Sequence, residues 1–422
     1  MKNLTYNSFE IEHQCPRCGA PVTLEEADRI LACSYCRVRL IMVYAGYPEY
    51  FLDPYLEGKP LQELIYIPYW RFRGLAFAGL PSNKEDRFID DTFLAAGIPF
   101  LPSRLGLQTR AFKVRPLSFQ KKGRFLQPQF SFEKVVTQLT EEKFSPSEPE
   151  DPPVLFQQVF IGETVSLVYA PIFIKDGIIF DGLGDRVLGK AGEPDLEKLP
   201  VTDQQESGQV QFIPVLCPYC GADLQGEKDT RVLLCRNCDR AWDFSQGELK
   251  KFDFRIMEAS GDERPVYYLP FWRIRARISG WPGHIPSPLS RPLLDDQQSP
   301  RGESEEENLY WRPAFKLSPS LFLTVSKAAS FRKPLTPMYL DTLARGQYYP
   351  VTLPWEQAVE GLTPVIADFI KNRLLPRFSR IKIEPADHLL IYIPFHLQGD
   401  ELVQQDMRLG ISRTSLHFGR FL

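Results

Sequence analysis

The same cysteine pattern and the same aromatic–arginine string occur twice in this chain, at one constant spacing of 202 residues. The cysteines of both copies follow the pattern C-x2-C-x14-C-x2-C. Each copy is followed by a string, IPYWRFRG at 67–74 or LPFWRIRA at 269–276. A fixed spacing across two different motifs is typical of an internal repeat. The sequence therefore predicts a tandem duplication, in which each half holds a cysteine-rich ribbon and a strand-rich body.

All eight cysteines belong to these two patterns. Two residues between a pair of cysteines let one tight turn direct both sulfurs at a metal ion, and two such turns complete a tetrahedral shell. Glycine follows the first pair of each set, where such a turn often needs a positive φ. We expect two structural Zn²⁺ ions, one per set: Cys15, Cys18, Cys33 and Cys36 in the first, and Cys217, Cys220, Cys235 and Cys238 in the second.

Two other chemistries of these cysteines stay open at this point. Disulfides would require an oxidising compartment, and the start of the chain has no apolar targeting segment that would indicate one. Four thiolates suit iron in a rubredoxin-like site as well as zinc, so the cysteines do not distinguish the two metals. A catalytic zinc usually keeps one position for water or substrate, whereas four cysteines fill the shell. The pattern therefore favours a structural metal over a catalytic one.

The segment that begins CPYCGADL and ends CRNCDRAWDF resembles the zinc-ribbon family, and the first copy fits the same pattern. As a whole the chain resembles bacterial tandem zinc-ribbon proteins, mostly uncharacterised, in which a four-cysteine ribbon precedes Y-x-P-x-W strands. The resemblance implies the architecture and the structural zinc ions. It implies no particular activity.

Alternation in the first string predicts a strand with two distinct faces. One face carries Tyr66, Pro68, Trp70 and Phe72, and the other Ile67, Tyr69, Arg71 and Arg73. Related strands, LVYAPIFI at 167–174 and LIYIPFHL at 390–397, close the two halves, and their pairing with the first strands is open. Helices are expected over 131–144 and over 354–375, the second interrupted near Pro364.

These patterns predict an α+β fold with two equivalent halves. Each half is a four-cysteine ribbon plus a mainly antiparallel sheet with one helix. Stretches rich in proline and charge mark the boundaries. The predicted segments are ribbon 1 at 1–45, body 1 at 46–189, a linker at 190–209, ribbon 2 at 210–248 and body 2 at 249–422, which includes a flexible insertion at 282–308.

Two groups of basic residues are candidates for binding an anion or a partner carboxylate. They are Arg71, Arg73, Arg273 and Arg275 in the strings, and Arg110, Lys113 and Arg115 in a run without acids. The favoured alternative is an ordinary solvated face with ion pairs inside the chain. The tryptophans of the strings are expected in the core rather than on a stacking platform.

No catalytic set stands out in the sequence. There is no glycine-rich phosphate loop and no nucleophile elbow, and the five histidines are scattered. With a formal charge of −3, the chain as a whole is not basic, as a nucleic-acid-binding protein often is. No apolar run is long enough to span a bilayer. We expect a cytoplasmic, non-enzymatic, zinc-binding adaptor or scaffold that docks a protein partner, as a subunit of a larger complex. A nucleic-acid-binding ribbon protein is the alternative, and an enzyme that uses the cleft between the halves is a third hypothesis.

Overall fold

The structure is a computed structural model of the chain. It describes residues 9–54, 64–79, 84–99, 101–105, 113–117, 123–135, 137, 157–184, 186–190, 200–202, 210–244, 247–259, 264–279, 309–332, 338–369 and 382–420. Some expectations lie outside these residues. They are Arg110, the insertion at 282–308, most of the linker at 190–209, and the ends of both predicted helices, at 138–144 and 370–375.

An 11-stranded mixed sheet forms the first half, around the long antiparallel strands β6 (Ile65–Gly79) and β10 (Gln157–Lys175). Its other strands are β1 (Glu10–Gln14), β2 (Pro21–Glu25), β5 (Glu49–Leu52), β7 (Lys84–Leu94), β8 (Lys113–Pro116), β9 (Arg124–Leu126), β11 (Ile178–Asp181), β12 (Val187–Lys190) and β13 (Val201–Thr202). Most pairs are antiparallel, but β1 with β8, β5 with β10 and β6 with β9 are parallel. Because β1 and β2 belong to ribbon 1, the sheet runs from body 1 into that ribbon without a break.

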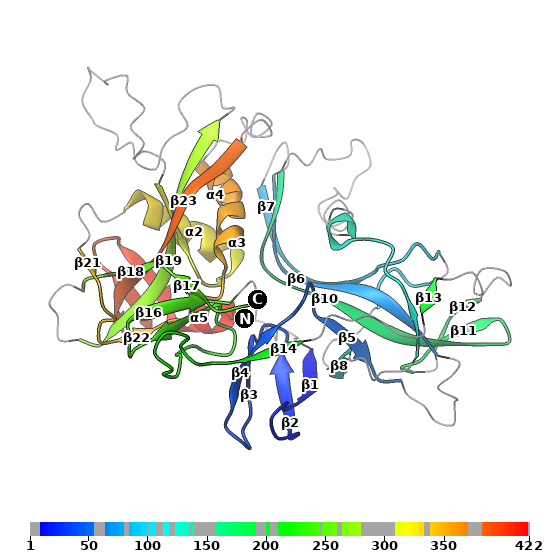
Figure 1. Cartoon of the computed structure of the whole chain (residues 1–422). Helices are drawn as coiled ribbons and strands as arrows, with labels where there is room; N and C mark the ends of the chain where they lie inside the picture. Colours follow the sequence, from blue (N-terminus) through cyan, green and yellow to red (C-terminus); the bar gives the residue numbers. More distant parts are fainter. Residues whose placement is uncertain are drawn as a thin grey trace, which may run out of the picture.

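An eight-stranded sheet forms body 2, around the long antiparallel strands β19 (Val266–Ser279) and β23 (Lys382–Gln398). The shorter strands are β18 (Phe254–Met257), β20 (Leu309–Pro313), β21 (Tyr339–Leu340), β22 (Gln347–Tyr348), β24 (Glu401–Gln404) and β25 (Leu409–Ser412). Figure 1 shows this body on the left and the long first-half sheet extending to the right.

The strand pairings of the two bodies correspond. The order β5–β10–β6–β7 recurs as β18–β23–β19–β20, and β8, β9 and β11–β12 have counterparts in β21, β22 and β24–β25. The Tyr-x-Pro strands of each half pair with each other, which the sequence left open. The opposed residues are Tyr66 with Pro171 and Pro68 with Tyr169 in the first half, and Tyr268 with Pro394 and Pro270 with Tyr392 in the second.

The tryptophan of each string holds the loop that precedes a helix. Trp70 Nε1 donates a hydrogen bond to the carbonyl of Phe130 at 2.8 Å. Trp272 Nε1 donates to the carbonyl of Leu353 at 2.9 Å. Both indoles are buried, as expected for core residues. The repeated string therefore supplies the same strand and the same loop anchor in both halves.

The expectation of one helix per half is wrong for body 2. That half contains α2 (Pro319–Phe331), α3 (Trp355–Glu360), α4 (Leu362–Phe369) and α5 (Arg413–Gly419), whereas body 1 is helical at 132–135. The interruption near Pro364 falls at Gly361, and Pro364 sits in the first turn of α4, where its missing N–H is tolerated. The α2 segment includes three serines, one threonine and one valine among its 13 residues, and these residue types have modest helix propensity. Its buried face therefore supports the helix more than its propensity does.

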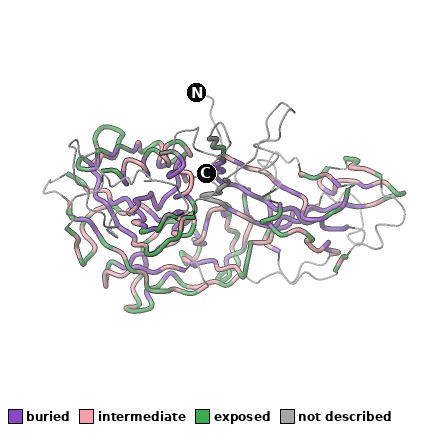
Figure 2. The backbone as a smooth tube through the Cα atoms, turned by 90° about the horizontal axis from the view of Figure 1, so that it is seen from above, coloured by how far each residue is buried: buried purple, intermediate pink, exposed green. Residues whose placement is uncertain are grey.

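The two halves share a core. Leu75 and Phe77, near the end of β6, belong to the same apolar cluster as Phe322 of α2 and Ile366 of α4. Figure 1 shows β6 and β7 beside α3 and α4, and Figure 2 shows buried residues along the long first-half strands and through body 2. The helices thus fill the space between the body 2 sheet and the end of the first-half sheet.

Candidate metal centres and the ribbon junction

Short hairpins carry the cysteines of both ribbons. Ribbon 1 uses the β1–β2 hairpin and the hairpin of β3 (Ile30–Ala32) and β4 (Arg39–Val43). Ribbon 2 uses the strands β14 (Gln211–Pro214), β15 (Val232–Cys235), β16 (Arg240–Asp243) and β17 (Lys250–Phe252). Within each set the four sulfur atoms lie within 4.8 Å of one another, so the structure brings together all eight predicted ligands as two groups.

The sulfur–sulfur distances fit a tetrahedral metal shell. They are 3.7 Å for Cys15–Cys36 and Cys18–Cys33 in ribbon 1, and 3.7 Å for Cys217–Cys238 and 3.5 Å for Cys220–Cys235 in ribbon 2. A tetrahedron with Zn–S bonds of about 2.3 Å has edges of about 3.8 Å. A disulfide would need about 2.05 Å, and all eight cysteines are free thiols. Each group can therefore hold one metal ion. A thiolate set of this kind accommodates zinc or iron.

The turns around the ligands use a left-handed residue directly after the second cysteine of each pair. Gly19 and Gly221 have φ of 73° and 74°, which confirms the expectation for the glycines. Arg37 and Asp239 hold the same position in the other two turns, with φ of 58° and 51°. The sequence reasoning missed these two residues, although their place after the cysteine pair was the available signal.

The two ribbons are joined to each other. Strand β14 of ribbon 2 pairs antiparallel with β4 of ribbon 1. The Arg39 guanidinium donates to the carbonyls of Leu224 at 3.1 Å and Gly226 at 2.6 Å, across the junction. A shared apolar cluster includes Ile41 of ribbon 1 and Trp242 of ribbon 2. The ribbons therefore form one unit, which contacts body 1 through β1 and β8 and body 2 through Arg236.

Arg71 and Arg73, two predicted partner-binding residues, bind carboxylates of the chain itself. Arg71 is 1% exposed, and its Nε and Nη2 donate to the two carboxylate oxygens of Glu26 at 3.0 and 3.1 Å. It also pairs with Asp90 on β7. Arg73 is buried too, with its Nη1 3.9 Å from a Glu26 oxygen. The favoured expectation of a solvated face with ion pairs inside the chain is therefore confirmed for the ion pairs. It is wrong for the solvent exposure, because ribbon 1 covers this side of the strand.

The remaining described candidates lie nearer the surface. Arg273 is half-buried and Arg275 is exposed. Lys113 Nζ lies 2.9 Å from a carboxylate oxygen of Glu12, and Arg115 Nη2 lies 3.2 Å from the other. Ion pairs with ribbon 1 therefore already engage the described part of the basic run, and an external anion for these residues stays a prediction.

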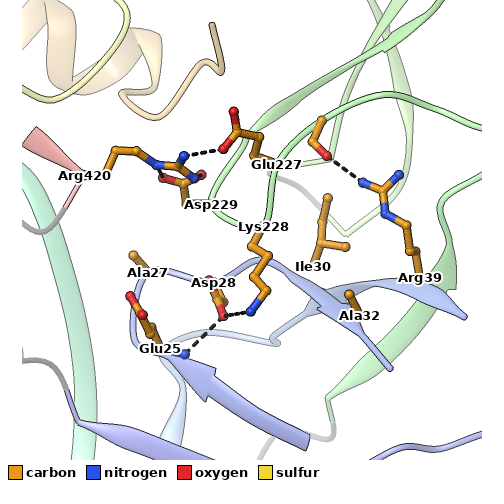
Figure 3. A pocket seen from close by; sticks show the side chains of 11 residues that line it. Glu25, Ala27, Asp28, Ile30, Ala32, Arg39, Glu227, Lys228, Asp229 and Arg420 are labelled. Carbon is orange, nitrogen blue, oxygen red and sulfur yellow. Dashed lines mark hydrogen bonds and ion pairs between the residues drawn. The ribbon is translucent and has the colours of Figure 1, made fainter. Parts of the chain in front are cut away.

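A pocket of about 490 Å³ opens between the ribbons (Figure 3). Asp28 lies on its wall, where burial raises the pKa of the carboxyl to about 6 despite a hydrogen bond from the Glu25 N–H and the ammonium of Lys228 at 3.9 Å. On the opposite wall Arg420 pairs with Glu227 and Asp229. No sequence pattern pointed to this pocket, because its walls come from segments about 200 and 400 residues apart along the chain.

Among the residues that the structure describes, the two cysteine groups are the clusters of potential metal ligands. In the same part of the chain, the helices fall short of the length and apolar character that crossing a bilayer demands. Comparison with protein-family models, curated proteins and solved structures finds no match for this chain.

Proposed function

We propose that this protein is a non-enzymatic, zinc-binding adaptor that presents its joined ribbons to a protein partner. The observation that carries the proposal is the closed shell of each metal site. Four thiolates at tetrahedral spacing leave no position for water or substrate. The role of the ion in this proposal is therefore to stabilise the ribbon surface and not to catalyse a reaction. A metal of this type supports a ribbon that is too small for an extensive core of its own.

Two exposed tyrosines mark the proposed docking surface. Tyr35 lies between Cys33 and Cys36 and is 70% exposed, and Tyr219 lies between Cys217 and Cys220 and is 65% exposed. Large aromatic side chains of this kind carry much of the binding energy at protein interfaces. The guanidinium carbon of Arg240 sits 3.1 Å from the ring centroid of Tyr219 and holds that ring in place.

The repeated architecture supports a tandem duplication and membership of the tandem zinc-ribbon proteins that the sequence resembles. The matched strand pairings and the two tryptophan–carbonyl hydrogen bonds favour a common ancestor for the halves. A duplicated ribbon that pairs with its copy gives a rigid platform, which suits a scaffold in a larger complex.

Nucleic-acid binding is the alternative function. It would use a basic surface, and Lys113 and Arg115 are engaged by Glu12 of ribbon 1, with Asp53 of body 1 as a second partner of Arg115. An enzyme in the pocket between the ribbons is supported less, because Arg420 binds the two acids contributed by ribbon 2. General acid–base catalysis at Asp28 would need a second group within hydrogen-bond reach of the same substrate, and the Arg420 ion pairs already engage the nearest acids of ribbon 2.

The test is native purification of the full chain at low salt from its own cells, with mass spectrometry and metal analysis of the same sample. The proposal expects two zinc ions per chain and a stoichiometric protein partner. The double variant Tyr35→Ser/Tyr219→Ser should keep both metals and lose the partner. Met338→Ser, at a position 70% exposed on body 2, is the matched control and should keep it.

Other results would redirect the proposal. Nuclease-sensitive nucleic acid without a protein partner, with binding that falls steeply with salt, would favour the alternative. Iron in place of zinc would argue for electron transfer. A partner retained by the double tyrosine variant would place the docking surface elsewhere.

A further inference from the structure

A second, smaller cavity lies at the place where both ribbons and both bodies meet. Four cationic side chains line it: Arg29 from ribbon 1, Arg231 from ribbon 2, and Lys316 and Arg420 from body 2. Arg29 and Arg231 are separated by the repeat spacing, so equivalent loops of the two ribbons face each other here. The one acidic side chain in its wall is Asp229, whose carboxylate accepts hydrogen bonds from Arg420.

Body 1 adds a hydroxyl to this wall. Thr164 of β10 lines the cavity, its side chain is nine-tenths buried, and its Oγ1 has no hydrogen-bond partner among the described residues. A buried hydroxyl without a hydrogen-bond partner costs free energy. Because this hydroxyl belongs to a residue that lines the cavity, it indicates that the cavity holds a hydrogen-bond acceptor. With four cations around it, the natural recipient is an anion.

The size of the cavity restricts which anion fits. Its volume is about 10 Å³, close to the minimum for one water-sized particle. A single monatomic ion matches this volume more closely than a phosphate or a carboxylate group does. We propose that this cavity binds one chloride-sized monatomic anion, which joins the four parts of the chain.

The charge of Lys316 agrees with this assignment. Burial lowers the pKa of its ammonium to about 7, and the neighbouring Arg231, Arg73 and Arg29 lower it further than Asp229 raises it. An anion in the cavity favours the protonated ammonium and offsets the repulsion among these cations. The outer pocket of Figure 3 shares Ala27, Asp229 and Arg420 with this cavity, so the two cavities adjoin each other.

Thermal unfolding of the zinc-loaded full chain tests the proposal, in chloride, bromide and gluconate at equal ionic strength. Gluconate is too large for the cavity. We expect the melting temperature to be higher in chloride and bromide by roughly 2–4 °C, with a saturating dependence on halide. Lys316→Met should abolish this difference, and Thr164→Val should raise the halide concentration for half effect several-fold. Ser166→Ala is the matched control, because it removes another buried hydroxyl without a partner among the described residues, two positions along β10 and outside the cavity.

Crystals grown in bromide supply an independent readout. An anomalous bromide peak between Lys316 and Thr164 supports the proposal even where one variant fails to fold. Water in the cavity together with equal melting temperatures in the three salts would overturn it. The same halide response in wild type, Lys316→Met and Thr164→Val would also overturn it, since it would show a general salt effect.

Discussion

In the first half, the arginines of the string lie beneath ribbon 1, where Glu26 and Asp90 bind Arg71. In the second half, the equivalent Arg273 is half-buried and Arg275 is exposed. The burial differs because the residues at the positions of the arginines' partners differ between the halves. Lys228 occupies the place of Glu26 in the repeat, and Leu309 lies opposite Arg275 where Asp90 lies opposite Arg73. The halves share a backbone and differ in electrostatics.

The ribbons consequently dock in different ways. Ribbon 1 extends the sheet of body 1 through β1 and β8 and places an acid over buried arginines. Ribbon 2 uses Arg236, whose guanidinium donates to the carbonyls of Ala344 at 3.3 Å and Gly346 at 2.9 Å in body 2. The repeated string therefore preserves strands and loop anchors in both halves, while substitutions elsewhere in the chain change the contacts between ribbon and body.

The largest predicted effect comes from removing one metal. Cys15→Ser and Cys217→Ser change equivalent buried ligands, and each should lower the metal content from two ions to one per chain. Metal binding contributes on the order of 10 kcal/mol to folding such a site. Because the ribbons pair through β4 and β14, loss of either metal should speed hydrogen exchange in both ribbons. Ser34→Ala, in the same turn as two ligands, is the control and should keep both ions.

Exchange confined to the ribbon that lost its ion would contradict the description of the ribbons as one unit. Metal content by elemental analysis and exchange by mass spectrometry give the two readouts on one sample.

The second prediction separates the two strings. Arg71→Met leaves the buried carboxylate of Glu26, which is 5% exposed, without its main partner. Breaking a buried pair in this way costs about 3–5 kcal/mol. Arg273→Met, at the equivalent and less buried position, should change the free energy of unfolding by less than about 1 kcal/mol. Denaturant unfolding of the full chain measures both.

Rescue distinguishes the ion pair from simple packing. Glu26→Gln in the Arg71→Met background should recover part of the lost stability, because it removes the buried charge that Arg71 no longer neutralises. Equal losses for Arg71→Met and Arg273→Met would refute the contrast between the halves.

The local features of this fold were readable from the sequence. The cysteine spacing identified both groups of candidate metal ligands. Period-two alternation assigned the faces of β6, since Tyr66, Trp70 and Phe72 lie in one apolar cluster and Ile67 and Tyr69 in another. These inferences succeeded because each depends on residues close together in the chain.

Features that depend on distant segments were not readable. Arg71 was expected on a solvated face, and its burial depends on Glu26 of a ribbon 45 residues earlier in the chain. The joining of the ribbons through Arg39 and the carbonyl of Leu224 spans 185 residues. Helix α2 gave too weak a local signal, because its stability comes from packing against β20 and the first half. Tertiary contacts of this kind leave no periodic trace in the sequence.

The third prediction concerns a feature that the halves share. Trp70→Phe and Trp272→Phe each remove the hydrogen bond from Nε1 to a loop carbonyl, at 2.8 and 2.9 Å. Leaving that carbonyl without its donor costs about 1–3 kcal/mol. The two variants should lose similar stability in denaturant unfolding, because the anchor is the same in both halves. A loss in one variant and not the other would show that the second anchor is dispensable.

The smallest predicted effect concerns a buried carboxyl that ribbon 1 has and ribbon 2 lacks. Asp28 is buried on the pocket wall, and Thr230 holds the equivalent place in ribbon 2 without a charge. Burial raises the pKa of Asp28 from 3.8 to about 6, so the folded protein holds this proton more tightly than the unfolded chain. Its ionisation therefore lowers stability as the pH rises from about 4 to about 6. Asp28→Asn should be more stable than wild type by about 1–2 kcal/mol at pH 7, and nearly equal to it at pH 4.

The matched control is Asp223→Asn, which removes a carboxylate from an exposed position of ribbon 2 and should leave the pH profile unchanged. Urea unfolding of the three zinc-loaded proteins across this pH range measures the difference. If Asp28→Asn is less stable than wild type at pH 7, the ion pair with Lys228 outweighs the cost of burying the carboxylate. In that case charge pairing, rather than shared apolar packing, would hold the two ribbons together on the pocket side. Ribbon 2 would then use a charge pair for its contact, as ribbon 1 does with Glu26 and Arg71.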